Sequence, residues 1–189
     1  MGIISSLRRM LGDRTVPDAD LYAEFPQSAF KPISAAAPYP VKDFLGEQRV
    51  YAYRLQFMVT VEDVDRVAQQ LGRHFPGAIG TRFQEGPASG ADGSIRYSSR
   101  PEFGGAVVEL VTNSITFIAS LDALHLRPPA PWIVFPNVDA AAVGALQGDL
   151  DYWWTWFWLP YWQAAPAEER QQLLAQAPED WRDFFESHS

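Results

Sequence analysis

The stretch VYAYRLQFMV, residues 50–59, decides the fold of this chain. It is rich in aromatic and β-branched residues, and its large apolar side chains alternate along the chain. In a β-strand this alternation places Tyr51, Tyr53, Leu55, Phe57 and Val59 on one face. The stretch therefore predicts a strand with one buried face.

An amphipathic helix is predicted directly after this strand. Thr60 is a favourable N-cap, and Glu62 and Asp63 stand in the first turn, where the helix dipole favours negative charge. The apolar residues of 61–75 recur at intervals of three and four, and Pro76-Gly77 then ends the pattern.

Further strand-like stretches follow at 78–85, 94–99 and 106–112. Residues 86–93 are predicted to form a flexible loop, and 132–135 a short buried strand or extended segment. The apolar residues of 115–119 fit another strand, and they also fit a helix running to His125. The order β-α-β-β-β predicts an α+β fold, with a helix on one face of an antiparallel or mixed sheet.

The two ends of the chain differ from this core. Residues 1–48 are expected to form an N-terminal helix and a proline-rich arm packed on the body, because prolines interrupt 13–48 at intervals too short for a helix. Residues 49–189 are expected to form a single α+β domain with C-terminal helices from about residue 138. An alanine-rich helix capped by Asn137 or Asp139 should end at Gly148. Two more should start at Pro166 and Pro178, since proline suits the first helical position.

The composition gives no indication of catalysis. The chain of 189 residues has no Cys, which excludes disulfides, thiolate zinc sites and cysteine nucleophiles. Its three His have no metal-ligand spacing, and neither a nucleotide-binding loop nor a nucleophile elbow is present. We therefore expect no enzyme activity, no cofactor and no metal. The absence of Cys and of a secretory signal predicts a cytoplasmic location.

Negative charge is concentrated in the C-terminal fifth of the chain. The net charge is −8, and residues 149–189 hold eight acidic and two basic side chains, a net charge of −6. Such a region is either a solvated helical face or a surface that attracts a basic partner, and it disfavours nucleic acid. The carboxylates expected at a partner-binding surface are those of Asp149, Asp151, Glu168, Glu169, Glu179, Asp180 and Asp183.

The run LDYWWTWFWLPYW at 150–162 is the most unusual segment. It is shorter than the roughly 20 apolar residues that cross a bilayer, so membrane insertion is not expected. As a helix it is apolar all round, which predicts burial on nearly every face. The alternatives are an exposed aromatic face that anchors a protein partner, through Trp154, Trp158 and Trp162, or stacking on sugars.

One polar cluster falls on the predicted strands. It consists of Arg96, Tyr97 and Arg100, with Glu102 and Glu109 nearby. Alternation places Arg96 on the face opposite Tyr97. The cluster fits a solvated sheet face with cross-strand ion pairs, or alternatively an anion pocket.

The order of elements over 50–112 resembles one module of the vicinal oxygen chelate superfamily. This resemblance implies a divalent metal held by strand residues, and Gln56 and Glu109 would stand at such places. The chain lacks the strand histidine of that family. A metalloenzyme or small-molecule-binding protein of this kind is one alternative function.

A second resemblance covers the C-terminal region. The sequence WFWLPYW at 156–162, the EER at 168–170 and the aromatic residues of 181–185 are similar to the Trp-rich helical ends of bacterial immunity proteins. Those proteins are antitoxins that inhibit polymorphic and type VI-delivered toxins by direct binding. The resemblance implies a cognate toxin, expected to be basic, as the partner. A generic protein-interaction scaffold is the remaining alternative.

Overall fold

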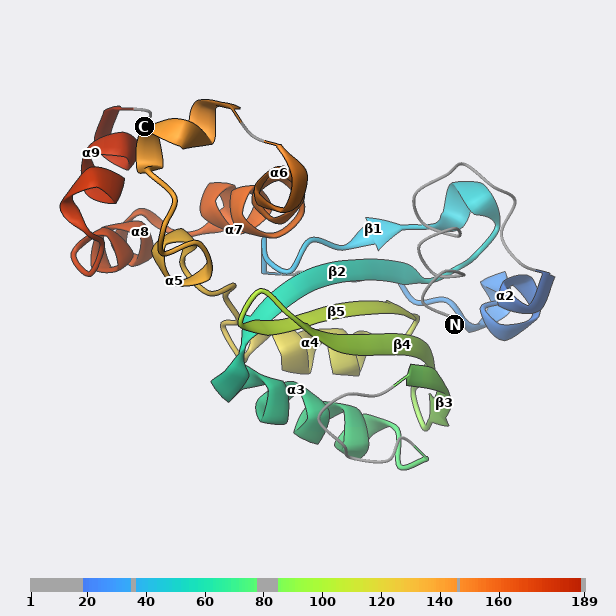
Figure 1. The fold of residues 1–189 in the computed structure, drawn as a ribbon. Helices are drawn as coiled ribbons and strands as arrows, with labels where there is room; N and C mark the ends of the chain where they lie inside the picture. Colours follow the sequence, from blue (N-terminus) through green and yellow to red (C-terminus); the bar gives the residue numbers. More distant parts are fainter. Residues whose placement is uncertain (1–18, 35–36, 78–84, 146, 188–189) are drawn as a thin grey trace.

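The computed structural model describes residues 19–34, 37–77, 85–145 and 147–187. Its centre is a five-stranded antiparallel sheet in the order β1-β2-β5-β4-β3. The strands are β1 (Asp43–Phe44), β2 (Tyr53–Thr60), β3 (Glu85–Gly90), β4 (Gly93–Glu102) and β5 (Gly105–Thr112). Helices pack on this sheet (Figure 1), and the predicted α+β class is confirmed.

Two helices cover one face of the sheet, α3 (Val61–His74) and α4 (Ile115–Asp122). Figure 1 shows them next to each other below the strands. The alternation predicted for β2 is confirmed, because Leu55, Phe57 and Val59 are fully buried in the cluster that these helices complete. The predicted helix after β2 is α3, which begins one residue after Thr60.

The prediction of a flexible loop at 86–93 is wrong. Most of that segment belongs to β3, which pairs with β4 from Glu85 opposite Ser98 to Gly90 opposite Gly93. Glycine and proline suggested a loop, but Pro87 is tolerated because β3 pairs on one side only within the described residues. The strand predicted at 78–85 lies outside the described residues except for Glu85.

Residues 115–122 form the helix α4, which resolves the ambiguity left by the sequence. Ser114 caps this helix, since its hydroxyl accepts a hydrogen bond from the backbone N–H of Phe117 at 3.3 Å. Asp92, in the turn between β3 and β4, accepts from the backbone N–H of Thr116 at 3.2 Å and from the Ser114 hydroxyl at 3.3 Å. The hairpin turn is thereby joined to the start of α4.

We expect Asp92→Asn to lower the free energy of unfolding at pH 7 by about 0.3–1 kcal/mol, because the amide keeps an acceptor oxygen but loses the negative charge near the start of α4 and its ion pair with Lys31. Partial burial raises the pKa of Asp92, but the hydrogen bonds from Thr116 and Ser114 and the charge of Lys31 outweigh it, and the pKa falls below 3.8. A lowered carboxylate pKa stabilises the fold above pH 3.8, and this stabilisation is lost as the pH falls through the lowered value.

Urea unfolding at pH 7 and at pH 3 measures this effect. The difference between wild type and Asp92→Asn should shrink at the lower pH. An equal difference at both values would contradict the role of the charge. Asp180→Asn, at an exposed position, should be neutral throughout.

The N-terminal arm packs on one end of the opposite sheet face. Its described elements, besides β1, are α2 (Ala19–Glu24), η1 (Gln27–Ala29) and η2 (Gly46–Gln48). The expectation that prolines leave no room for a helix in 13–48 is therefore wrong, because the interval between Pro17 and Pro26 holds the short helix α2. Leu21 and Phe25 of this arm are buried against Val50, Ala52 and Val111. An ion pair between Glu24 and Arg96 of β4 joins the arm to the sheet. The helix predicted at the extreme N-terminus lies outside the described residues.

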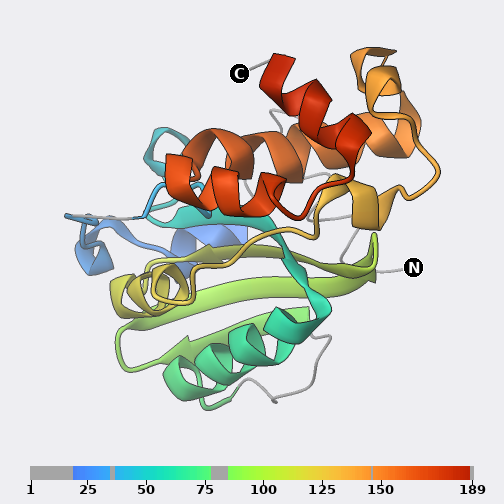
Figure 2. The same ribbon diagram turned by 90° about the vertical axis from the view of Figure 1, so that its left-hand side faces the viewer.

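The C-terminal helices lie over the other end of that face (Figures 1 and 2). They are α5 (Pro131–Val134), η3 (Ala140–Ala145), α6 (Gly148–Trp153), the π-helical turn η4 (Trp154–Trp158), α7 (Leu159–Ala164), α8 (Ala167–Leu174) and α9 (Glu179–Ser187). On the sheet, Met58 and Val107 pack against these helices, and both side chains are completely buried.

Two expectations for this region need correction. Residues 132–135 are not a buried strand, because Pro131 begins the one-turn helix α5 and leaves Ile133 65% exposed. The alanine-rich segment is the 3-10 helix η3, and Gly148 starts α6 instead of ending a helix. Asp139, one of the two predicted caps, stands directly before η3, and its carboxylate accepts a hydrogen bond from the backbone N–H of Ala141 at 2.9 Å.

Candidate functional site

The outer face of α9 carries a group of exposed carboxylates. Glu179, Asp183 and Glu186 are spaced by four and three residues and therefore share one side of the helix, with Asp180 beside them. All four are exposed, and none forms an ion pair within the described part of the chain. The only basic residue of α9, Arg182, instead donates to the backbone carbonyls of Leu174 and Ala177 at the end of α8.

Of the four, Glu186 was not among the carboxylates predicted from the sequence. The remaining predicted carboxylates lie on neighbouring helices. Asp149 and Asp151 are exposed on α6, and Asp151 accepts a hydrogen bond from Thr155 at 3.2 Å. Glu168 is exposed on α8, whereas Glu169 is half-buried and accepts from the Tyr161 hydroxyl at 2.9 Å. Burial and the Glu169 carboxylate raise the pKa of Tyr161 well above 10.0, so this hydroxyl stays a donor at physiological pH. Glu169 is thus engaged inside the C-terminal region.

Trp158 is a core residue and not a surface anchor, which corrects one of the sequence-based alternatives. Its side chain is 0% exposed and stacks between Trp153, at 5.6 Å between ring centroids, and Trp162, at 5.7 Å. Trp154 is partly buried against α9, with its ring 6.0 Å from that of Phe185. Most of the aromatic run therefore builds the core of the C-terminal helices.

Trp162 is only partly buried and has a cation as neighbour. Its ring packs 4.4 Å from that of Phe185, and the guanidinium of Arg170 lies 5.8 Å from its centroid. This cation–π contact uses one of the two basic side chains of the region. Trp162 is held between core and surface rather than presented as a free anchor.

The exposed aromatic residue of this run is Trp156, which sequence reasoning did not single out. It is 50% exposed, while Phe157 and Trp158 beside it are fully buried. The π-helical turn Trp154–Trp158 rotates the side chains relative to a regular α-helix, so an α-helical wheel cannot predict which tryptophan faces solvent.

The polar cluster expected on the strands forms around Arg100. Its guanidinium donates to Glu109 at 2.8 Å, to Glu102 at 3.0 Å and to the Tyr152 hydroxyl at 3.3 Å. Burial lowers the pKa of Arg100, but the carboxylates of Glu109 and Glu102 outweigh it, so the pKa is raised. The Glu109 side chain is only 5% exposed, so this is a partly buried network and not a solvated sheet face.

Arg100 also connects two layers of the molecule. Arg100 and Glu109 belong to the sheet, whereas Tyr152 belongs to α6. The network therefore helps to position the C-terminal helices on the sheet. Arg96 is not part of it, because Arg96 pairs with Glu24, and Tyr97 lies on the opposite face, within the core covered by α3.

Gln56 and Glu109, the positions implied by the vicinal oxygen chelate resemblance, are cross-strand neighbours. The Glu109 carboxylate is already neutralised by Arg100. Among the described residues, no three His, Asp or Glu side chains are grouped as metal ligands would be. The arrangement is that of a structural ion pair.

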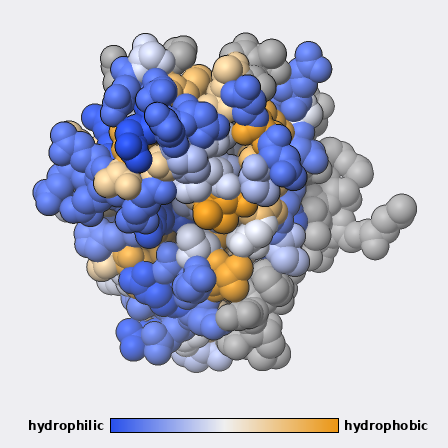
Figure 3. All heavy atoms as spheres, turned by 60° about the vertical axis from the view of Figure 1, so that its left-hand side comes forward, coloured by the Kyte–Doolittle hydropathy of each residue, from blue (hydrophilic) through white to orange (hydrophobic). Residues whose placement is uncertain are grey.

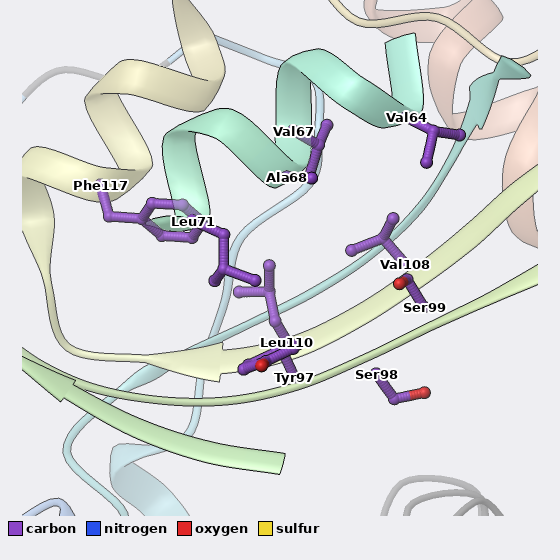
Figure 4. A pocket seen from close by; sticks show the side chains of 10 residues that line it. All are labelled: Val64, Val67, Ala68, Leu71, Tyr97, Ser98, Ser99, Val108, Leu110 and Phe117. Atoms are coloured by element: carbon purple, nitrogen blue, oxygen red, sulfur yellow. The ribbon is translucent and has the colours of Figure 1, made fainter. Parts of the chain in front are cut away.

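A small cavity of about 30 Å³ lies between α3 and the sheet. Figure 4 shows Val67 and Leu71 of α3 and Phe117 of α4 on one side of it, and Val108 and Leu110 of β5 on the other. A single water needs about 10–15 Å³ by this measure, so the cavity holds at most two. It is a packing gap and not a substrate pocket.

Within the described residues, no helix combines the length and the apolar composition needed to cross a bilayer. We compared the chain with protein-family models, curated proteins and solved structures, and nothing matches it in any of the three.

Proposed function

We propose that this chain is a cytoplasmic immunity protein, which binds a basic bacterial toxin and neutralises it by direct contact. The observation that carries the proposal is the outer face of α9, where four exposed carboxylates have no ion-pair partner among the described residues. Glu179 and Asp180 stand in the first turn of α9, where the helix dipole favours negative charge. Asp183 and Glu186 lie beyond this turn, and like charges one turn apart slightly destabilise a helix. Their concentration on one face is useful when a basic surface docks there.

The electrostatic argument favours a protein partner over the other classes considered. Unpaired surface carboxylates attract a basic protein and accelerate its association. They repel the phosphates of nucleic acids. The resemblance of the Trp-rich C-terminal region to immunity proteins supports the same proposal. Because immunity proteins bind toxins, this resemblance is the reason why we propose a toxin as the partner.

Neutralising three α9 carboxylates, by Glu179→Gln, Asp180→Asn and Asp183→Asn, should slow association with the partner about tenfold at low ionic strength. The difference should shrink in high salt, because exposed charges are screened. The fold should not change, since these side chains are exposed and form no ion pair within the described residues. Stopped-flow association at several salt concentrations measures the effect.

A matched control raises the net charge by the same amount elsewhere. Gln27, Gln48 and Gln69 are all exposed and lie outside the C-terminal helices. Their replacement with lysine should leave the association rate within about twofold of wild type if steering is local to α9. Equal slowing by both sets of changes would show that only the overall charge matters.

Inhibition itself is tested by co-expression. The captured partner domain, produced alone in a laboratory bacterium, should stop growth, and co-production of this chain should restore it. A partner that is harmless, or one whose toxicity persists alongside this chain, would overturn the immunity proposal.

A further inference from the structure

The exposed side of the π-helical turn η4 carries the indole ring of Trp156. This side chain is 50% exposed, and among the described residues its ring has no aromatic neighbour. The adjacent tryptophans of the run differ from it, because Trp154 packs against Phe185 of α9 and Trp158 is fully buried. Trp156 therefore stands outside the aromatic core that the rest of the turn builds.

The register of the π-helical turn brings Asp151 to the same side as Trp156. Side chains five positions apart are neighbours here: the ring centroids are 5.4 Å apart in the pair Tyr152–Phe157 and 5.6 Å apart in the pair Trp153–Trp158. Asp151 stands five positions before Trp156 and is exposed as well. An exposed indole ring and an exposed carboxylate thus share one side of this turn.

The Asp151 carboxylate has acceptor capacity left. Its Oδ1 atom accepts a hydrogen bond from the Thr155 hydroxyl at 3.2 Å, and the carboxylate forms no ion pair within the part of the chain that the structure describes. A carboxylate has about four lone-pair sites, so it can accept further hydrogen bonds from a cation that approaches from solvent.

The same region already contains one tryptophan–guanidinium contact. The Arg170 guanidinium lies 5.8 Å from the ring centroid of Trp162. The other basic side chain of residues 149–189, Arg182, donates to two backbone carbonyls. Both cations of this region of net charge −6 are therefore engaged, and no cation lies over Trp156 within the described residues.

The surroundings favour a flat, positively charged occupant. In Figure 3 the side of the molecule that carries α8 and α9 comes forward, and it is mainly hydrophilic with small hydrophobic areas between. A guanidinium suits such a surface, because it stacks on an indole ring and donates hydrogen bonds to a carboxylate at the same time. A neutral sugar can also stack on tryptophan, but the net charge of the region does not attract it.

We propose that Trp156 and Asp151 together bind an arginine side chain of the partner protein, with the guanidinium stacked on the indole ring and hydrogen-bonded to the carboxylate. The inference rests on the proposed function for the existence of a protein partner. It adds a contact on η4 that is separate from the acidic face of α9, and it names the side chain that this contact recognises.

The probe is a short peptide with blocked ends and one central arginine between glycine and serine residues. Titrated into the full chain, it should shift the indole N–H NMR signal of Trp156 in a saturable way. The same peptide with citrulline, which has the shape of arginine without its charge, should leave this signal in place. Asp151→Asn should weaken binding of the arginine peptide about threefold, the loss expected for an exposed ion pair. Asparagine keeps an acceptor oxygen for Thr155, so the turn should remain intact.

Asp180→Asn is the matched control, because it removes the same charge from an exposed position on α9. It should leave the affinity for the arginine peptide unchanged. Equal shifts from both peptides, no shift of Trp156 from either, or equal weakening by Asp180→Asn would overturn the proposal.

Cellobiose, a neutral disaccharide, tests the alternative of sugar stacking. A saturable shift of the Trp156 signal by cellobiose, with none from the arginine peptide, would overturn the proposal in favour of a sugar site. The titrations need no toxin, so their failure leaves the proposed function standing. Loss of partner capture or of growth protection would overturn the proposed function instead.

Discussion

Replacing Trp158 with alanine is expected to lower the free energy of unfolding by about 3–5 kcal/mol, the usual cost of truncating a buried tryptophan. Trp158 is 0% exposed and lies in ring contact with Trp153, Tyr161, Trp162 and Phe185. The cavity left behind would sit where α7 and α9 meet, so the surrounding rings cannot close it without breaking other contacts. Urea denaturation followed by circular dichroism measures the loss.

Two variants separate burial from residue type. Trp156→Ala, in the same helical turn, should cost less than about 1 kcal/mol because half of this side chain already faces solvent. Trp158→Phe should cost less than the alanine variant, because it keeps a ring and removes an indole N–H that is buried without a hydrogen-bond partner among the described residues. Similar losses for Trp156→Ala and Trp158→Ala would contradict the packing described.

The second large effect is expected at Arg100. Arg100→Met should lower the free energy of unfolding by about 3 kcal/mol, because it leaves the buried carboxylate of Glu109 without its cation. The change also removes the donors to Glu102 and to Tyr152, so the contact between sheet and α6 is weakened. Thermal and urea unfolding of the purified variant measure this.

The double variant Arg100→Met with Glu109→Leu provides the control. Replacing both members of a buried pair with apolar residues removes the unpaired charge, so much of the lost stability should return. A double variant that is less stable by the sum of the two single losses would show that Arg100 and Glu109 do not act as a pair.

The sheet and its covering helix could be predicted because their patterns are local. Leu55, Phe57 and Val59 alternate, and the apolar residues of α3 recur at helical spacing. The segment 86–90 could not be predicted as a strand, because its glycine and proline are typical of loops and its pairing with β4 depends on tertiary structure. The same limit applies to 115–122, because its apolar spacing fits both a strand and a helix. The structure shows a helix, and Ser114 caps its first turn.

The candidate site could be predicted only in part. The carboxylates of α9 were expected at the surface because charged groups are rarely buried. Which tryptophans are buried could not be predicted, because the π-helical turn changes the facing of the aromatic run and brings Trp156 outward and Trp158 inward. The exposure of Ile133 could not be predicted, because the apolar stretch 132–135 is typical of a buried segment and its helical turn starts at Pro131.

The central claim is that this chain binds a basic protein through the acidic face of α9. It is tested most directly by parallel capture from the native cell with three baits. These are the wild-type chain, the variant with Glu179, Asp180 and Asp183 neutralised, and the control with lysine at positions 27, 48 and 69. The account predicts one stoichiometric basic protein on the wild-type and control baits, and its loss from the neutralised bait. The same protein on all three baits, or no stoichiometric protein on any, would contradict it.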